Sequence, residues 1–417
     1  MSSTLLTPPL TPLPEINTPA PLRPQDAPSP LSLRLLHVAT SPGEGGIERY
    51  SVRLASGLAQ HGAYLRFACL PGGRVGRLCA AAGIPTLPLA VRNSGDLRAA
   101  WRLARMIGRE HIDLVHVHSR RDYLPALLGV VLARRLAPSP TRRPRLLLHA
   151  HMVRPLGAPG RMSSRLFERH ADGVLAVSEA VQTHLLAGYN FAPGFVRLLH
   201  NGVDLERFPP FASHRAQAWR RALRQEWAIP QGALVIAMVG RLDTKGQDAM
   251  LAAAPPLLAE APGLHIVFAG AEGQPGTQAR LRALARAGGL EERVKFLGAR
   301  EDVPAVLAAA DVLVHLPQDE SFGLALAEAM ASGLPTVATD IGGCREVTLE
   351  GQTGRLIPPG DQEALLRALL PLLGAGSGPL RHRLGAAGRA RVDEKFSLAG
   401  QGARLEEYYH ELCPLPR

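Results

Sequence analysis

Apolar and polar positions alternate along most of the chain in a pattern that predicts strands and helices in turn. Short apolar runs typical of buried strands are separated by longer segments with helical spacing. In the first half the predicted strands are 33–39, 64–70, 113–118, 145–150 and 173–178, with a helix over 47–60. In the second half they are 234–240, 264–269, 294–297, 312–316 and 336–338, and a last helix covers about 398–412. Strand, helix and strand in series predict an α/β fold with two doubly wound parallel sheets.

The same pattern divides the chain into five segments. Residues 1–31 contain nine prolines and few large apolar side chains, which predicts a disordered tail. We expect a Rossmann-like domain over 32–204, a polar linker over 205–231, a second Rossmann-like domain over 232–396, and a helix at 397–417 that packs back towards the first domain. Ligands of such sheets collect beyond the carboxyl ends of the strands, so two facing domains predict a cleft between them.

Composition agrees with two globular domains. The chain has 417 residues, of which 46% are hydrophobic and 20% charged, as is usual for proteins with sizeable cores. It contains no apolar run of about 18 residues and no basic-then-apolar leader, so we expect a cytoplasmic location. The four cysteines lack the spacing of a metal site or a disulfide framework, which suits a reducing compartment.

The basic surplus lies entirely in the first half. Residues 1–215 contain 26 Arg, no Lys and 13 acidic residues, a net charge of +13, whereas residues 216–417 carry −2. A one-sided basic surface favours an anionic membrane surface or a phosphorylated substrate as a partner. Codon usage is the alternative, because the whole chain has three lysines. We expect no nucleic acid, since aromatic residues make up 5% of the chain and none is interleaved with a basic motif.

The most informative stretch is a loop that opens a helix near residue 324. Ser321-Phe-Gly323 precedes a helical pattern, so the backbone N–H groups of 322–324 are expected to lack partners and to attract an anion or sugar hydroxyls. Glu320 can accept hydrogen bonds from a sugar, and Glu328 can bind the two hydroxyls of a ribose. The alternative is that Glu320 stabilises the helix dipole and Glu328 is a solvated helix residue.

Two cations follow an earlier strand of the second half. The segment Gly240-Arg241-Leu-Asp-Thr-Lys245-Gly246 begins a helix, where cations are disfavoured unless they serve a ligand. Arg241 and Lys245 could neutralise the two phosphates of a diphosphate leaving group. The alternative is two ordinary solvated cations.

The first half offers weaker candidates. Gly45-Gly46 occupies the first strand-to-helix turn, where glycines allow a ligand to approach the backbone, although a plain tight turn fits as well. The histidines of two His-x-His pairs point to one face near strand ends, and the alternative to sugar binding is a four-histidine metal site. We expect no metal, because no carboxylate cluster accompanies these pairs, which are His116 with His118 and His149 with His151.

These motifs together resemble the retaining glycosyltransferases of family 4, from about residue 33 to 412. The matching segments are Gly45-Gly46-x-Glu48, 113–118, Asn201-Gly-Val-Asp204 with Phe208, 240–246, Phe296-x-Gly298 and 320–328 with its flanks. The resemblance implies the GT-B architecture, in which two Rossmann-like domains face each other across a cleft. It also implies a nucleotide-sugar co-substrate, UDP- or GDP-linked, and no bound metal.

The resemblance assigns roles by position. Arg241 and Lys245 would hold the diphosphate, Glu328 the ribose, Glu320 the transferred sugar, and His118 the sugar near the reacting carbon. The other expected donor-binding residues are Gly46, Gly240, Lys295, Gly298, Ser321, Phe322, Gly323 and Leu324. The expected acceptor-binding residues are Gly45, Glu48, Arg120, Arg121, His151 and Arg154.

The expected function is therefore transfer of a hexose, with retention, to a glycan or lipid-linked acceptor in the synthesis of cell-envelope polysaccharide or lipopolysaccharide. The resemblance also implies work at the inner face of the cytoplasmic membrane, where members of the family often act, and the basic half would suit this. One alternative is a nucleotide-sugar epimerase of the same architecture, which needs no acceptor and releases no nucleotide diphosphate. The other is a non-catalytic basic protein that binds membranes or polyanions.

Overall fold

Two parallel sheets form the frame of the molecule. The computed structural model describes residues 33–43, 45–137, 143–152, 161–189, 191–192 and 194–414, and for 161–164 the backbone alone. The tail predicted over 1–31 lies outside these residues. The described strands form a seven-stranded sheet of order β3-β2-β1-β4-β5-β6-β7 and a six-stranded sheet of order β10-β9-β8-β11-β12-β13. The predicted fold class, two doubly wound parallel sheets, is confirmed.

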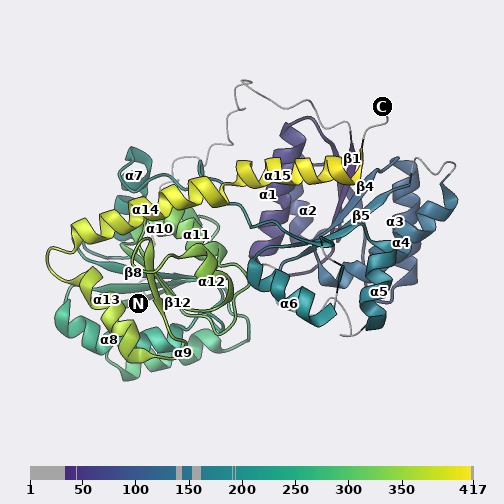
Figure 1. The fold of residues 1–417 in the computed structure, drawn as a ribbon. Coiled ribbons are helices and arrows are strands. Elements are labelled where there is room, and N and C mark those ends of the chain that lie inside the picture. Colours follow the sequence, from purple (N-terminus) through teal and green to yellow (C-terminus); the bar gives the residue numbers. More distant parts are fainter. Residues whose placement is uncertain are drawn as a thin grey trace, which may run out of the picture.

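The first sheet is covered by helices on both faces (Figure 1), so its central strands are almost completely buried. Its strands are β1 (Arg34–Ala39), β2 (Tyr64–Cys69), β3 (Thr86–Pro88), β4 (Leu114–Val117), β5 (Arg145–Ala150), β6 (Gly173–Ala176) and β7 (Val196–Leu198). Its helices are α1 (Gly46–Gln60), α2 (Arg74–Ala81), α3 (Leu97–Arg109), the 3₁₀ turn η1 (Arg120–Asp122), α4 (Tyr123–Leu136), α5 (Arg161–His170) and α6 (Glu179–Tyr189).

The second sheet repeats this arrangement (Figure 1). Its strands are β8 (Val235–Val239), β9 (His265–Ala269), β10 (Val294–Gly298), β11 (Val312–His315), β12 (Thr336–Thr339) and β13 (Gly354–Ile357). Its helices are α7 (His214–Glu226), α8 (Gln247–Glu260), α9 (Thr277–Ala287), α10 (Val303–Ala309), α11 (Leu324–Ala331), α12 (Gly342–Val347) and α13 (Gln362–Leu373), followed by α14 (Gly378–Phe396) and α15 (Leu398–Leu412).

Sequence patterning missed three strands, β3, β7 and β13. Each has three or four residues and lies at the edge of its sheet, so it shows too few alternations to be recognised. The segment expected as a linker contains α7, which packs on α10. The side chain of Arg224 on α7 is completely buried and donates a hydrogen bond to Asp311 over 2.8 Å, which fixes this helix to the second sheet.

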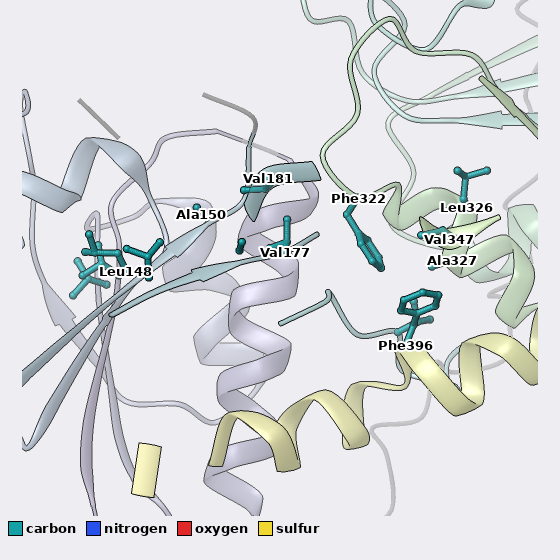
Figure 2. Packing of buried hydrophobic residues seen from close by; sticks show 14 of the residues in the cluster. Leu148, Ala150, Val177, Val181, Phe322, Leu326, Ala327, Val347 and Phe396 are labelled. Atoms are coloured by element: carbon teal, nitrogen blue, oxygen red, sulfur yellow. The ribbon is translucent and has the colours of Figure 1, made fainter. Parts of the chain in front are cut away.

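Helices α14 and α15 run one after the other across the two halves, α14 beside the second sheet and α15 beside the first (Figure 1). At their junction Phe396 packs against Phe322, with ring centroids 5.5 Å apart. Both phenylalanines belong to a buried apolar cluster that includes side chains of both halves (Figure 2). This cluster holds the loop before α11 at a fixed place between the sheets.

A carboxylate also joins the halves. Glu346 on α12 accepts hydrogen bonds from the backbone N–H groups of Glu179 and Ala180, over 2.8 and 3.0 Å, at the start of α6. His200 lies 3.1 Å from the same carboxylate. Burial alone raises the pKa of Glu346, but these hydrogen bonds outweigh it and hold the pKa below the usual range.

Candidate active site

A cleft of about 820 Å³ lies between the halves. It is formed by the loops after β8 and β11 on one side and by the turn between β1 and α1 on the other, all at the carboxyl ends of parallel strands. This is where ligands of such sheets bind. Among the described residues, seven Arg or Lys and seven Asp or Glu side chains line the cleft, so its chemistry depends on the position of each charge rather than on a net charge.

Lys245, Glu320 and His315 form a charged group on the second-half side. The Lys245 ammonium donates a hydrogen bond to Glu320 Oε2 over 2.7 Å, and His315 Nε2 lies 2.8 Å from the same oxygen. Burial alone raises the pKa of Glu320, but the interactions with His315 and Lys245 outweigh it, and the pKa lies well below the usual range. Glu320 is therefore ionised at neutral pH, and Lys245 has two further N–H donors for a ligand.

Gly246 fixes the position of Lys245. It has φ of 77°, in the left-handed region, and a Cβ there would lie 2.6 Å from the Cβ of Leu316. Glycine is required on both grounds. The turn therefore aims the lysine at the loop after β11.

The start of α11 offers unpaired backbone donors, as its sequence predicts. Gly323 caps the helix with φ of 94°, and within the described chain the N–H groups of Phe322, Gly323 and Leu324 have no acceptor. The loop is held from behind, because a Cβ on Gly343 would lie 2.3 Å from Phe322 Cα. These donors therefore face the cleft from a rigid support and suit an anion or hydroxyl groups.

Glu328 lies in α11 and lines the same cleft. Its Oε1 is 3.8 Å from Arg53 Nη1 of the first half, which is an ion pair rather than a hydrogen bond. Burial raises the pKa of Glu328, and Arg53 and Arg49 partly offset this rise. The carboxylate oxygens thus keep acceptor capacity for a diol.

Arg241 differs from Lys245 in being exposed. Its side chain is 60% exposed and stands 3.8 Å from Asp243, and its guanidinium donates no hydrogen bond to any described residue. A planar guanidinium of this kind can bind two phosphate oxygens at once.

On the first-half side, the turn at Gly45 and Gly46 closes against α11. A Cβ on Gly46 would lie 3.4 Å from a methyl group of Leu324. Further along α1, Arg49 reaches Glu301 of the second half over 2.6 Å. The two halves therefore contact each other across the cleft through these two pairs.

The structure brings most of the predicted site residues to this cleft, but not all. Those that line it are Gly45, Gly46, His151, Gly240, Arg241, Lys245, Glu320, Ser321, Phe322, Gly323, Leu324 and Glu328. Those that do not line it are Glu48, His118, Arg120, Arg121, Lys295 and Gly298. Arg154 lies outside the described residues.

Three of these residues lie outside the cleft for plain reasons. His118 is buried behind His151, whose Nε2 lies 3.3 Å from His118 Nδ1. At the end of β10, the residues that reach the cleft are Ala299, Arg300 and Glu301, just after the predicted pair Lys295 and Gly298. The roles predicted for these residues remain predictions.

Sequence reasoning missed His315 and the arginines of α1 and α2. His315 reads as part of an apolar strand, and its place as the last residue of β11, five before Glu320, was the signal available. Arg49, Arg53 and Arg74 carry no motif, because helix spacing alone does not say which face meets the other half.

Two groups of buried histidines could hold a metal ion by proximity. They are His37, His116 and His118, and His118, His149 and His151, with one ligand atom of each residue within 4.8 Å of the others. Their ring nitrogens already contact one another, and no carboxylate is among their hydrogen-bond partners in the described chain. The predicted absence of a metal remains a prediction.

Comparison with known families agrees with this geometry. The family model described as Glycosyltransferase Family 4 matches residues 44–207, and the one described as Glycosyl transferases group 1 matches residues 220–391. The chain belongs to glycosyltransferase family 4. The two matches adjoin the cleft from opposite sides, so the family relation covers both walls of the site.

Curated relatives of this family-4 chain include the D-inositol 3-phosphate glycosyltransferases of Corynebacterium urealyticum and Corynebacterium diphtheriae. They are 31% and 32% identical to it over 255 and 249 residues. These matches cover 59% and 58% of this chain, and the chain spans 58% and 57% of the length of the two relatives.

Solved structures resemble nearly the whole family-4 chain. A glycosyltransferase of Rickettsia africae has a TM-score of 0.81 at 22% identity, covering 92% of this chain and 99% of its own. Anabaena HepE, crystallised with UDP and glucose, has a TM-score of 0.76 at 23% identity, covering 91% of this chain and 100% of its own. The predicted GT-B fold is confirmed. Among the described helices, none is both long and apolar enough to cross a bilayer.

Proposed function

We propose that this protein transfers a hexose from a nucleotide sugar, UDP-linked rather than GDP-linked, to a hydroxyl acceptor with retention of configuration. The observation that carries the proposal is the Lys245 and Glu320 pair beside the unpaired N–H groups at the start of α11, within one cleft. UDP is favoured because Anabaena HepE, which shares the fold, was crystallised with UDP and with UDP-glucose.

The chemistry assigned to the cleft is a front-face displacement. The bond between the sugar's anomeric carbon and the diphosphate oxygen breaks, and the acceptor oxygen forms its bond to that carbon on the same face. The acceptor proton passes to the departing phosphate oxygen. Lys245, Arg241 and the N–H groups of α11 stabilise the negative charge that develops on the phosphate. Glu320 binds sugar hydroxyls and Glu328 binds the ribose.

The acceptor is proposed by class. A glycan or lipid-linked acceptor follows from the expected envelope function, whereas the names of the curated relatives indicate a phosphorylated inositol for those proteins. Arg49, Arg53 and Arg74 on the first-half side suit an acceptor whose hydroxyl lies near an anionic group, a property both classes share. An acceptor panel containing inositol phosphates and lipid-linked saccharides separates them.

A membrane contact is part of the proposal. Helix α3 exposes Leu97 by 69% and Trp101 by 52%, and its other exposed side chains are arginines, with no acidic residue in the helix. Apolar side chains among arginines suit an anionic lipid surface. Sedimentation with phosphatidylglycerol vesicles should carry down the wild type but less of a Trp101→Ser and Arg102→Glu variant. Equal sedimentation of both proteins would reject α3 as the contact.

The activity is tested first by binding and then by turnover. A panel of nucleotide sugars should contain one that raises the thermal unfolding midpoint, because a ligand that binds the native state stabilises it. With that donor and an acceptor, nucleotide diphosphate should be released. Conversion of the donor without an acceptor, and without free nucleotide diphosphate, would identify an epimerase instead. Binding of vesicles with no affinity for any nucleotide sugar would support the non-catalytic alternative.

A further inference from the structure

Five histidines and one tyrosine form a continuous buried network beside the cleft. The histidines stand near the carboxyl ends of adjacent strands of the first sheet: His37 on β1, His116 on β4 with His118 just beyond its end, and His149 on β5 with His151 just beyond its end. His37 and His116 are register partners on neighbouring strands. Tyr409 reaches the group from α15 and is completely buried. We call these six residues the imidazole network.

The contacts of the imidazole network follow a single path. His151 Nε2 lies 3.3 Å from His118 Nδ1, and His118 Nε2 lies 3.0 Å from His37 Nδ1. His37 Nε2 lies 3.2 Å from the Tyr409 hydroxyl, which lies 2.6 Å from His116 Nδ1. His116 Nε2 lies 3.2 Å from His149 Nδ1. Every contact therefore runs from the Nε2 side of one ring to the Nδ1 side of the next, directly or through the phenol.

The two ends of this path have no partner among the residues that the structure describes. They are His151 Nδ1 and His149 Nε2, and both atoms are buried. The two rings stack with centroids 4.1 Å apart, and His151 lines the cleft whereas His149 does not. The path thus ends at a buried ring nitrogen without a described partner, on a residue that lines the cleft.

Counting protons restricts the state of the network. Burial lowers the pKa of all five histidines, to about 3 for His37 and His151, so each ring is neutral and carries one N–H. If His151 donates from Nε2, every later ring must also donate from Nε2, and Tyr409 donates to His116. If His149 donates from Nδ1, the sequence runs in reverse and all five rings carry Nδ1–H. A mixed arrangement leaves another buried group without a partner, which is costly.

We propose that His151 is a substrate-positioning residue of the cleft, and that the imidazole network determines whether it offers an N–H or a lone pair to a substrate hydroxyl. The proposal rests on the proposed function, because it needs a hydroxyl-bearing substrate in the cleft. In the all-Nε2–H state His151 Nδ1 accepts a hydrogen bond, and in the all-Nδ1–H state it donates one. Neither state places a charge in the core of the first sheet.

The test compares two buried tyrosines. Tyr409→Phe removes the hydroxyl that joins His37 to His116 and leaves His151 in place. Tyr123→Phe is the matched control, because its hydroxyl donates to the backbone oxygen of His149 over 2.7 Å and takes no part in the path. The tautomer of each histidine is read from long-range proton–nitrogen spectra of the full-length protein labelled with ¹⁵N-histidine, with assignments from single His→Gln variants.

The wild type should show one tautomer in all five rings. Tyr409→Phe should separate His116 and His149 from the other three, and Tyr123→Phe should leave the wild-type pattern. Mixed tautomers in the wild type would overturn the proposal even if Tyr409→Phe fails to fold. Uptake of one Zn²⁺ per chain that abolishes these signals would also overturn it, since the cluster would then be a metal site.

Kinetics test the positioning role. Tyr409→Phe should raise the KM of one substrate or lower kcat by about threefold to tenfold, the effect of one misaligned hydrogen bond, while UDP affinity stays at the wild-type value. Tyr123→Phe should change none of these. Unchanged kinetics in Tyr409→Phe would reject the role of His151 without touching the proposed function. If the wild type does not bind UDP, the proposed function is rejected, but the tautomer result still stands.

Discussion

The two halves share one architecture but differ in the chemistry at the carboxyl ends of their strands. The second half places full charges at its strand ends, with Lys245 and Glu320 paired over 2.7 Å. The first half places neutral imidazoles at the equivalent ends, where burial holds the rings of His37 and His151 at a pKa of about 3. The charged residues that the first half brings to the cleft include Arg49, Arg53 and Arg74, which stand on α1 and α2 rather than at strand ends. We call the second-half side of the cleft, with Arg241, Lys245 and Glu320, the charged wall.

This difference follows from how each half treats burial. At the end of β11 in the second half, partners compensate a buried charge, as His315 and Lys245 do for Glu320. In the first half the ring nitrogens satisfy one another without any charge. Division of labour between two similar sheets thus needs no difference in fold, since the residues at the strand ends suffice.

Lowering the pH should produce the largest difference in stability between the two halves. The five network histidines are neutral when folded but take up protons when unfolded, so stability is full above pH 6.5 and falls as the pH drops towards 3. The loss is about 1.4 kcal/mol per pH unit for each such histidine. In the second half, burial lowers the pKa of two described histidines, His265 and His315, so acid should destabilise that half less.

Hydrogen exchange at neutral pH and near pH 5.5 measures this contrast. Amides of β1, β4 and β5 should lose protection more than those of β8, β11 and β12. Equal loss in both sheets would show that the network histidines do not control the acid stability of the first half.

Removing the charge of Lys245 should have the largest effect on turnover. Lys245→Ala takes one donor from the developing phosphate charge, and kcat should fall about 10²- to 10³-fold with little change in unfolding midpoint. Lys395→Ala is the matched control, because this exposed lysine lies on α14 outside the cleft. A wild-type rate for Lys245→Ala would contradict the assignment of Lys245 to the diphosphate.

Neutralising Glu320 should have a smaller effect, which strengthens UDP binding but slows sugar transfer. Glu320→Gln keeps the size of the side chain but leaves Lys245 without its counter-charge, so UDP should bind about threefold to tenfold more tightly. Sugar transfer should still fall by about tenfold, because a carboxylate that accepts sugar hydroxyls is lost. Titration of UDP and initial rates measure the two effects. Weaker UDP binding would contradict the account of this ion pair.

Weakening the contact of Glu346 with α6, which joins the halves, should have the smallest effect. Glu346→Gln weakens the hydrogen bonds to the start of α6, and we expect a cost of about 1 to 2 kcal/mol in stability, with kcat lowered about twofold. Glu350→Gln, which alters an exposed carboxylate of the second half, is the control. Denaturant unfolding measures the stability of both variants. If Glu350→Gln loses as much stability as Glu346→Gln, then the contact of Glu346 with α6 does not hold the halves together.

Much of this picture was predictable because its signals are local. Apolar runs locate the strands that precede Lys245 and Glu320, and glycines such as Gly246 and Gly323 locate the turns that aim them. The imidazole network was not predictable as a whole, because the joining of His37 and Tyr409 to the two His-x-His pairs depends on strand order and on where α15 packs. The burial of His118 behind His151 was hidden for the same reason.

Calorimetric titration of UDP and UMP into the wild type and an Arg241→Ala and Lys245→Ala double variant tests the central claim most directly. The account predicts that the wild type binds UDP about 10- to 100-fold more tightly than UMP, the worth of charge-assisted hydrogen bonds to the second phosphate. The double variant should lose most of this preference. Equal affinities in the wild type, or a preference that survives both substitutions, would contradict the assignment of the charged wall to a nucleotide diphosphate.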